Sequence, residues 1–86
     1  MFDSGARYRL DPQVALRPEP FGALAYHYGS RRLTFLRSKL LADLVASLES
    51  HESVDAALAA SIPEQQRPAY VKALESLAES RFICGC

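Results

Sequence analysis

The side chains best suited to catalysis or metal binding are few in this 86-residue chain. They are two histidines, His27 and His51, and two cysteines, Cys84 and Cys86, which form a C-x-C pair at the end. A closed tetrahedral metal site would need two ligands besides the thiolates, and neither histidine has ligand spacing relative to the cysteines. A disulfide across one intervening residue would close a strained loop. We therefore expect no metal ion, no cofactor and no structural disulfide.

Motifs that support catalysis are also missing from the sequence. It contains no glycine-rich phosphate loop, no HExxH and no GxSxG. A catalytic histidine needs a second titratable group that orients it, and neither His27 nor His51 has one at a recognisable spacing. The sequence predicts a protein that is not an enzyme, in which both histidines are solvated or packed.

Length and composition fit one small domain. Hydrophobic residues make up 49% of the chain, enough for a core, although a domain of this size buries only about 60% of its unfolded surface. No apolar run approaches the roughly 20 residues of a membrane span. The N-terminal MFDSGARYRL lacks the features of a secretory signal. We expect a soluble, cytoplasmic protein with no membrane partner.

Charge is spread unevenly, although the formal net charge is zero. Residues 1–39 carry seven cations and three anions, a net charge of +4, and the remainder carries three cations and seven anions, a net charge of −4. The basic half suits an acidic peptide. A DNA-binding helix usually concentrates positive charge, which the last predicted helix does not, so we expect no nucleic-acid partner.

The rest of the chain is organised around a predicted β-hairpin in residues 21–37, FGALAYHYGSRRLTFLR, which carries His27. With Gly29 and Ser30 as a two-residue turn, Tyr26 pairs with Leu33. Because side chains alternate along a strand, one face of the hairpin is aromatic and apolar. Its members are Leu24, Tyr26, Tyr28, Arg31, Leu33 and Phe35. We expect helices to cover this face and the last strand to be a sheet edge.

A short strand from Val14 should precede the hairpin, and three helices should follow it. Ser38 and Ser53 are placed to cap the first two helices, and Pro68 fits the first turn of the third. Apolar residues recur at three- and four-residue spacing in the first helix, at Leu40, Leu41, Leu44, Val45 and Leu48. This order predicts an α+β, winged helix-turn-helix-like fold: a three-stranded antiparallel sheet followed by three helices.

The predicted boundaries leave short segments outside the domain. Residues 1–12 are mixed and polar and end at a turn signal, which predicts a flexible N-terminal arm. The domain should span residues 13–83, followed by a frayed tail at residues 84–86. An edge strand within this domain would offer unpaired backbone groups to an extended peptide, or would bind nothing and be protected by its arginines.

The segment RPEPFGALAYHYGSRRLTFLRSKLLADLVASL, residues 17–48, resembles the RiPP recognition element family. Within that family it is most similar to the peptide chaperones of mycofactocin biosynthesis, relatives of the pyrroloquinoline-quinone peptide chaperones. The cues are R-P-E-P-F-G entering a strand, the Y-G-S-R-R-L-T-F-L hairpin and a leucine-rich helix that begins at a serine. The similarity extends more loosely over residues 10–83.

This resemblance implies a non-catalytic protein that binds the leader of a ribosomally made precursor peptide. It implies that the leader is presented to a radical S-adenosylmethionine maturase, and that it docks as an added strand in a groove walled by the third helix. The implied pairing strand is Arg32, Leu33, Thr34, Phe35, Leu36 and Arg37, and the implied helical wall is Tyr70, Leu74 and Leu77.

Two other functions stay open from the sequence. One is a winged-helix DNA-binding regulator, and the other is a general interaction domain without peptide preference. An exposed edge is also compatible with a homodimer.

Overall fold

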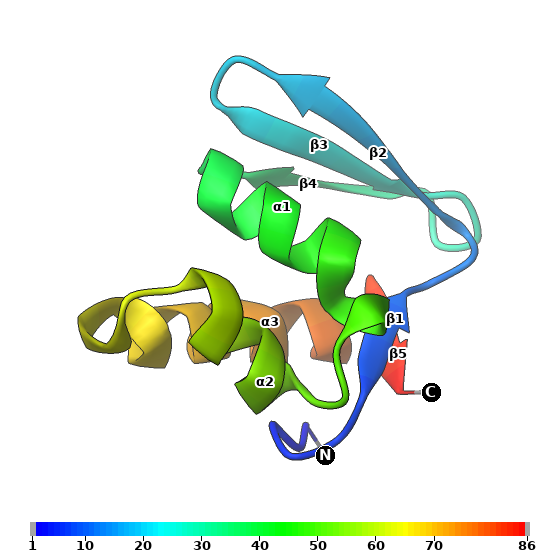
Figure 1. The fold of residues 1–86 in the computed structure, drawn as a ribbon. Coiled ribbons are helices and arrows are strands. Elements are labelled where there is room, and N and C mark those ends of the chain that lie inside the picture. The colour runs from blue at the N-terminus through cyan, green and yellow to red at the C-terminus, as the bar shows by residue number, and fades with distance from the viewer. Residues whose placement is uncertain (1, 86) are drawn as a thin grey trace.

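The fold is built on a three-stranded antiparallel sheet with strand order β2-β3-β4, seen in a computed structural model that describes residues 2–85. The strands are β2 (Val14–Glu19), β3 (Gly22–His27) and β4 (Arg32–Leu36). Three α-helices follow and lie on one side of the sheet (Figure 1). The predicted α+β class, with its three-stranded sheet and three helices, is confirmed.

The hairpin of β3 and β4 has the predicted register but a longer turn. Leu24 lies opposite Phe35 and Ala25 lies opposite Thr34. The strands stop at His27 and Arg32, so the turn takes in residues 28–31 rather than two residues. Arg31 closes this turn with φ 57°, in the left-handed region.

The helices cover the opposite face of the hairpin from the one predicted. Ala23, Ala25 and Leu36 are 1–3% exposed, whereas Leu33 and Phe35 are 54% and 51% exposed. The alanines are small enough to let a helix pack closely on β3, and Leu36 supplies the bulk beside them. The expectation that Leu33 and Phe35 face the core was therefore wrong, and the aromatic face is exposed.

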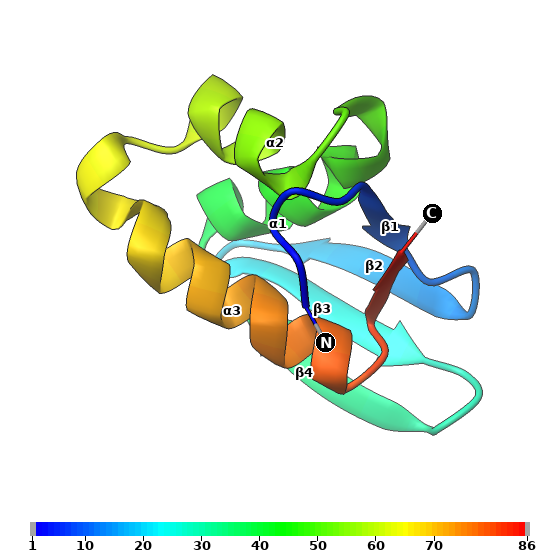
Figure 2. The same cartoon turned by 90° about the horizontal axis from the view of Figure 1, so that it is seen from below.

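Helices α1 (Lys39–Ser47), α2 (Val54–Ser61) and α3 (Arg67–Glu79) begin where the sequence predicts them. The Leu41 amide donates to the Ser38 hydroxyl, and the Ala56 amide donates to the Ser53 hydroxyl, each at 3.0 Å, which confirms both caps. Short 3₁₀ turns, η1 (Leu48–Ser50) and η2 (Glu64–Gln66), follow α1 and precede α3. Figure 2 shows α3 on the β4 side of the sheet.

The two ends of the described chain pair with each other. β1 (Tyr8–Leu10) and β5 (Ile83–Gly85) form a separate two-stranded antiparallel sheet in which Tyr8 lies opposite Gly85. The Asp11 amide extends the pairing by donating to the Phe82 carbonyl at 3.0 Å. These strands lie where the sequence suggested an arm and a tail, of which residues 1 and 86 fall outside the described range. Each strand has three residues, too few for an alternating pattern to be recognised.

His27 is the polar residue buried with the core, at 7% exposure. Its Nδ1 atom accepts a hydrogen bond from the Ser30 amide at 3.1 Å, and its ring meets Phe82 edge to face at 5.7 Å. These contacts tie the β3–β4 turn to the segment that enters β5. His27 is thus a packed histidine with a structural role.

Candidate functional site

β4 is an edge strand. It pairs with β3 on one side, and no strand within residues 2–85 pairs with its other side. The predicted edge is therefore present in the described part of the chain. An uncovered edge offers backbone donors and acceptors that an extended peptide can use.

The hydrogen-bond pattern identifies which residues of β4 face outward. The Tyr28 amide donates to the Gln13 carbonyl at 2.8 Å, so Tyr28 directs its backbone groups to the β2 side. Residues alternate in direction along an antiparallel strand, so His27 and Ala25 direct theirs to β4. Their partners, Arg32 and Thr34, are thereby satisfied inside the sheet. The outward groups are the amide and carbonyl of Leu33 and of Phe35.

Two hollows flank the end of β4, one on each face of the sheet. The outer hollow, about 300 Å³, is lined by Phe21, Phe35 and Arg37. The helix-side hollow, about 210 Å³, is lined by Arg37, Ser38, Leu41, Ala69, Tyr70 and Ala73. Arg37 contributes to both, and both linings are largely apolar. A strand added beside β4 would direct alternate side chains toward these two sides.

The helix-side hollow is held by contacts between β4, α1 and α3. The Ser38 and Tyr70 hydroxyl oxygens lie 3.2 Å apart and are hydrogen-bonded. Ala69 and Ala73, one helical turn apart on α3, are small enough to leave space beside Tyr70. Helix α3 thus lines this hollow through Ala69, Tyr70 and Ala73.

The nine residues proposed from the sequence fall into three groups. Arg32, Leu33, Phe35 and Arg37 are exposed along the edge, and Thr34 and Tyr70 are half-buried. Leu36, Leu74 and Leu77 are buried in the core and offer almost no surface to a ligand. The structure therefore groups Arg37 with Tyr70 at one hollow and places the two leucines of α3 behind it.

Sequence reasoning missed several residues of the two hollows. Phe21 packs edge to face on Phe35, with ring centroids 5.9 Å apart, although it precedes the strand in which a site was sought. Ser38 was identified only as a helix cap. The available signal was the pair Ala69 and Ala73, because two small residues one helical turn apart leave space beside Tyr70.

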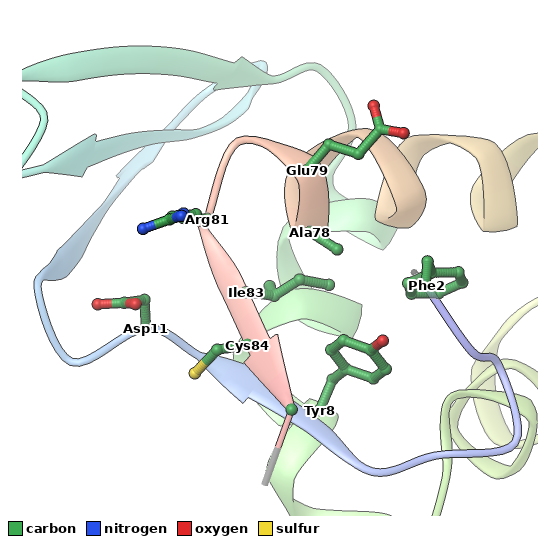
Figure 3. Close-up of a pocket in the computed structure, with 9 residues that line it drawn as sticks. Phe2, Tyr8, Asp11, Ala78, Glu79, Arg81, Ile83 and Cys84 are labelled. Carbon is green, nitrogen blue, oxygen red and sulfur yellow. The ribbon is translucent and has the colours of Figure 1, made fainter.

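A third hollow of about 360 Å³ lies beside β5 (Figure 3). Its apolar residues Phe2, Tyr8 and Ile83 lie on one side of β5, whereas Asp11 and Arg81 lie on the other side. The polar groups therefore do not converge on one point. Phe2 and Tyr8 pack ring on ring at 5.0 Å, which fits a structural contact between the two chain ends.

Within residues 2–85, no three His, Cys, Asp or Glu side chains are grouped so that they could hold a metal ion. None of the helices in that range is long and apolar enough to cross a membrane. The candidate site described above, the β4 edge with its two flanking hollows, depends on neither feature.

Comparison with known proteins assigns this chain to a family. A model described as the peptide chaperone MftB family matches residues 7–84. The chain belongs to the peptide chaperone MftB family. Residues 7–84 include β1 and most of β5, so the family match covers the paired chain ends as well as the sheet and helices.

Relatives named peptide chaperone MftB support this membership. The protein from Mycolicibacterium smegmatis is 43% identical over 83 residues, which cover 95% of this chain and 81% of the relative. The proteins from Mycobacterium ulcerans and Mycobacterium tuberculosis are 43% and 40% identical, over 95% of this chain and 76% of each relative. No solved structure matches the chain significantly, so a likeness to winged-helix structures stays a prediction.

Proposed function

We propose that this protein is a non-catalytic peptide chaperone of mycofactocin biosynthesis that binds the leader of a ribosomally made precursor peptide along β4. Membership of the peptide chaperone MftB family supports the chaperone role. The observation that carries the binding mode is the outward pair of residues, Leu33 and Phe35, whose backbone groups no strand in the described chain uses. An added strand would complete the ladder there.

The two hollows explain how a backbone-based mode can still be selective. Backbone hydrogen bonds are nearly independent of sequence, so selectivity depends on side-chain contacts. In the bound leader, one side chain would enter the outer hollow beside Phe35, and a neighbour of opposite orientation would enter the helix-side hollow beside Tyr70. The leader should therefore carry apolar residues at positions that differ by an odd number.

Charge favours an acidic leader. Arg32 and Arg37 are exposed at the two ends of β4, and neither takes part in the Arg17–Glu19 ion pair or the His27–Asp11 contact found in the described chain. Both guanidinium groups are therefore available to leader carboxylates. The contribution of each exposed pair would be modest, about 0.2–1 kcal/mol.

The bound leader would be presented to a radical S-adenosylmethionine maturase in the cytoplasm, and that enzyme would carry out the chemical step.

Two copies of the free protein could also pair through β4, and the leader would then compete with this homodimer for the same edge. Residues 13–83 would hold the whole peptide-binding surface.

Calorimetric titration with a synthetic precursor leader tests this function. We expect micromolar binding, with protection of the Leu33 and Phe35 amides from hydrogen exchange when the leader is added. Absence of binding at tens of micromolar would count against the proposal. Titration with a labelled DNA duplex tests the alternative of a DNA-binding regulator. Helix α3 has two cations, Arg67 and Lys72, and two anions, Glu75 and Glu79, so it lacks the net positive charge that DNA binding favours.

A further inference from the structure

The outer face of the sheet is apolar and uncovered. Its large hydrophobic residues are Tyr28, Leu33, Phe35 and Phe21, with exposures of 61%, 54%, 51% and 44%. All three helices lie on the other side of the sheet (Figure 1). Contiguous exposed apolar patches on small proteins usually mark interaction sites.

The aromatic side chains on this face are already packed on one another. Phe21 meets Phe35 at an interplanar angle of 71°, and Tyr26 meets Tyr28 at 81° with centroids 5.1 Å apart. Packed aromatic rings have few conformations to lose on binding, and tyrosine and arginine are enriched among residues that contribute most to protein interfaces.

A leader strand beside β4 would not cover this face. Adjacent strands lie about 4.8 Å apart, so side chains of the added strand reach mainly the β4 row, Leu33 and Phe35. Tyr26 belongs to β3, one strand further from the edge, and Tyr28 lies in the turn. These residues would stay accessible to a second partner in the peptide complex.

Charges around the face favour a partner with acidic groups. Arg31 and Arg37 flank β4 at its two ends, and Arg17 on β2 has a side chain that is 77% exposed. Only Arg17 has an anionic partner among the described residues, Glu19 at 3.1 Å. Two copies packed face to face would bring these cations together, which disfavours a second copy. A partner with an apolar centre and a carboxylate-bearing rim complements the face.

Arg31 lies at the same end of the outer face as Tyr28. Its φ of 57° lies in a region where glycine and asparagine are less strained than arginine. It is the last residue of the turn that carries the exposed Tyr28. Because Arg31 and Tyr28 belong to one turn and both are exposed, a single partner can contact both side chains.

We infer that the outer face is the docking surface for the enzyme that modifies the presented peptide. This inference rests on the proposed function. The enzyme would place an apolar patch on Tyr26 and Tyr28 and carboxylates against Arg31. Outward side chains of a leader added at β4 would extend the same face, so the enzyme would contact the chaperone and the leader together. Binding of leader and enzyme should then be cooperative.

The test compares the double variant Tyr28→Ser/Arg31→Glu with a matched control, Leu40→Ser/Lys72→Glu. The control removes an exposed leucine and reverses an exposed charge on the helical side. Thermal unfolding by circular dichroism verifies that both variants fold. Calorimetry measures the affinity of the synthetic leader, and surface plasmon resonance measures the affinity of the purified maturase with and without leader.

We expect the outer-face variant to lose at least about tenfold in maturase affinity while its leader affinity stays within about twofold of wild type. The control should match wild type in both. In wild type, leader should raise maturase affinity by about fivefold or more. Unchanged maturase affinity in the outer-face variant, or an equal loss in the control, would overturn the inference. The inference would also be overturned if wild type formed a dimer and the outer-face variant dissociated that dimer without losing affinity for the maturase. A wild-type protein that binds no leader would instead overturn the proposed function.

Discussion

The hydroxyl oxygens of Ser38 and Tyr70 lie 3.2 Å apart and join the end of β4 to the wall formed by α3. The same Ser38 oxygen accepts the amide hydrogen of Leu41 at 3.0 Å and so caps α1. One serine therefore fixes both the start of a helix and the width of the helix-side hollow. Stability of the cap and shape of the hollow should change together when this serine is altered.

Substitution Ser38→Ala should destabilise the fold by about 1–2 kcal/mol, because α1 loses its cap and Tyr70 loses its partner. Tyr70→Phe should cost about 1 kcal/mol. Because the two changes remove one shared hydrogen bond, the double variant should be more stable than the sum of the single effects predicts, by about 0.5 kcal/mol or more. Urea denaturation of the four proteins measures this coupling. Strict additivity would show that the contact contributes nothing.

Proline substitutions at neighbouring positions should separate the open edge from the paired one. Leu33→Pro removes an outward amide and should leave the sheet intact but weaken leader binding by about 1 kcal/mol relative to Leu33→Ala. Thr34→Pro removes an amide that faces β3, so it should lower the unfolding free energy itself. Calorimetry and urea denaturation give the two quantities. Equal leader affinity in folded Leu33→Pro and Leu33→Ala would place the leader elsewhere.

Gly22 should tolerate no side chain. It has φ 147°, and a Cβ atom built there would overlap the Leu36 carbonyl oxygen, a backbone atom that cannot rotate away. Gly22→Ala should therefore destabilise the protein by about 3 kcal/mol and disturb the end of β4. Gly5→Ala is a suitable comparison, because the nearest atom there is a carboxylate oxygen of Asp3 at 3.3 Å. A Gly22→Ala variant as stable as Gly5→Ala would contradict this geometry.

Arg81→Gly should stabilise the protein. Arg81 has φ 65° and follows Ser80, the C-cap of α3, and the Phe82 amide donates back to the Leu77 carbonyl at 2.8 Å, the bonding pattern of a helix end that favours glycine. Relief of the left-handed conformation should add about 0.5–1 kcal/mol, partly offset by the flexibility of glycine when unfolded. Thermal unfolding should show a midpoint higher by a few degrees. Lys72→Gly, inside α3, should lower the midpoint instead.

Binding of an acidic leader should weaken as salt concentration rises, because Arg32 and Arg37 are exposed and their attraction to carboxylates is screened. Arg37→Gln should reduce both the affinity for the leader and the salt dependence of that affinity. Lys72→Gln, at an exposed position of α3 that lines neither hollow, should change neither quantity. Calorimetry at several salt concentrations measures both. Equal salt dependence in wild type and Arg37→Gln would exclude Arg37 from the interface.

Local rules predicted much of this fold. Serine caps and apolar spacing located the helices, and the pairing of Leu24 with Phe35 followed from the centre of the turn. The alternation of side chains along the strands predicted which residues share a face of the sheet. It did not predict which face the helices cover, because that depends on how closely α1 can approach Ala23 and Ala25. The β1–β5 pairing joins residues more than 70 positions apart and left no local signal.

The candidate site was predicted in part for a similar reason. A two-residue turn and the observed longer turn give the same register, because both are centred between Gly29 and Ser30. They differ in which pair closes the hairpin with hydrogen bonds, and this reverses which amides of β4 face outward. The sequence therefore located the edge strand, whereas the assignment of Leu33 and Phe35 as its outward residues required the structure.

Pairing of Tyr8 with Gly85 closes the described part of the polypeptide nearly into a ring. A flexible linker could connect β5 to the segment that enters β1, and the backbone could be opened in the solvent-exposed turn at residues 28–31. Such a circularly permuted chain would keep every strand neighbour while exchanging a covalent connection between β3 and β4 for one between β1 and β5. The spatial order of this molecule is thus separable from the order in which its residues are joined.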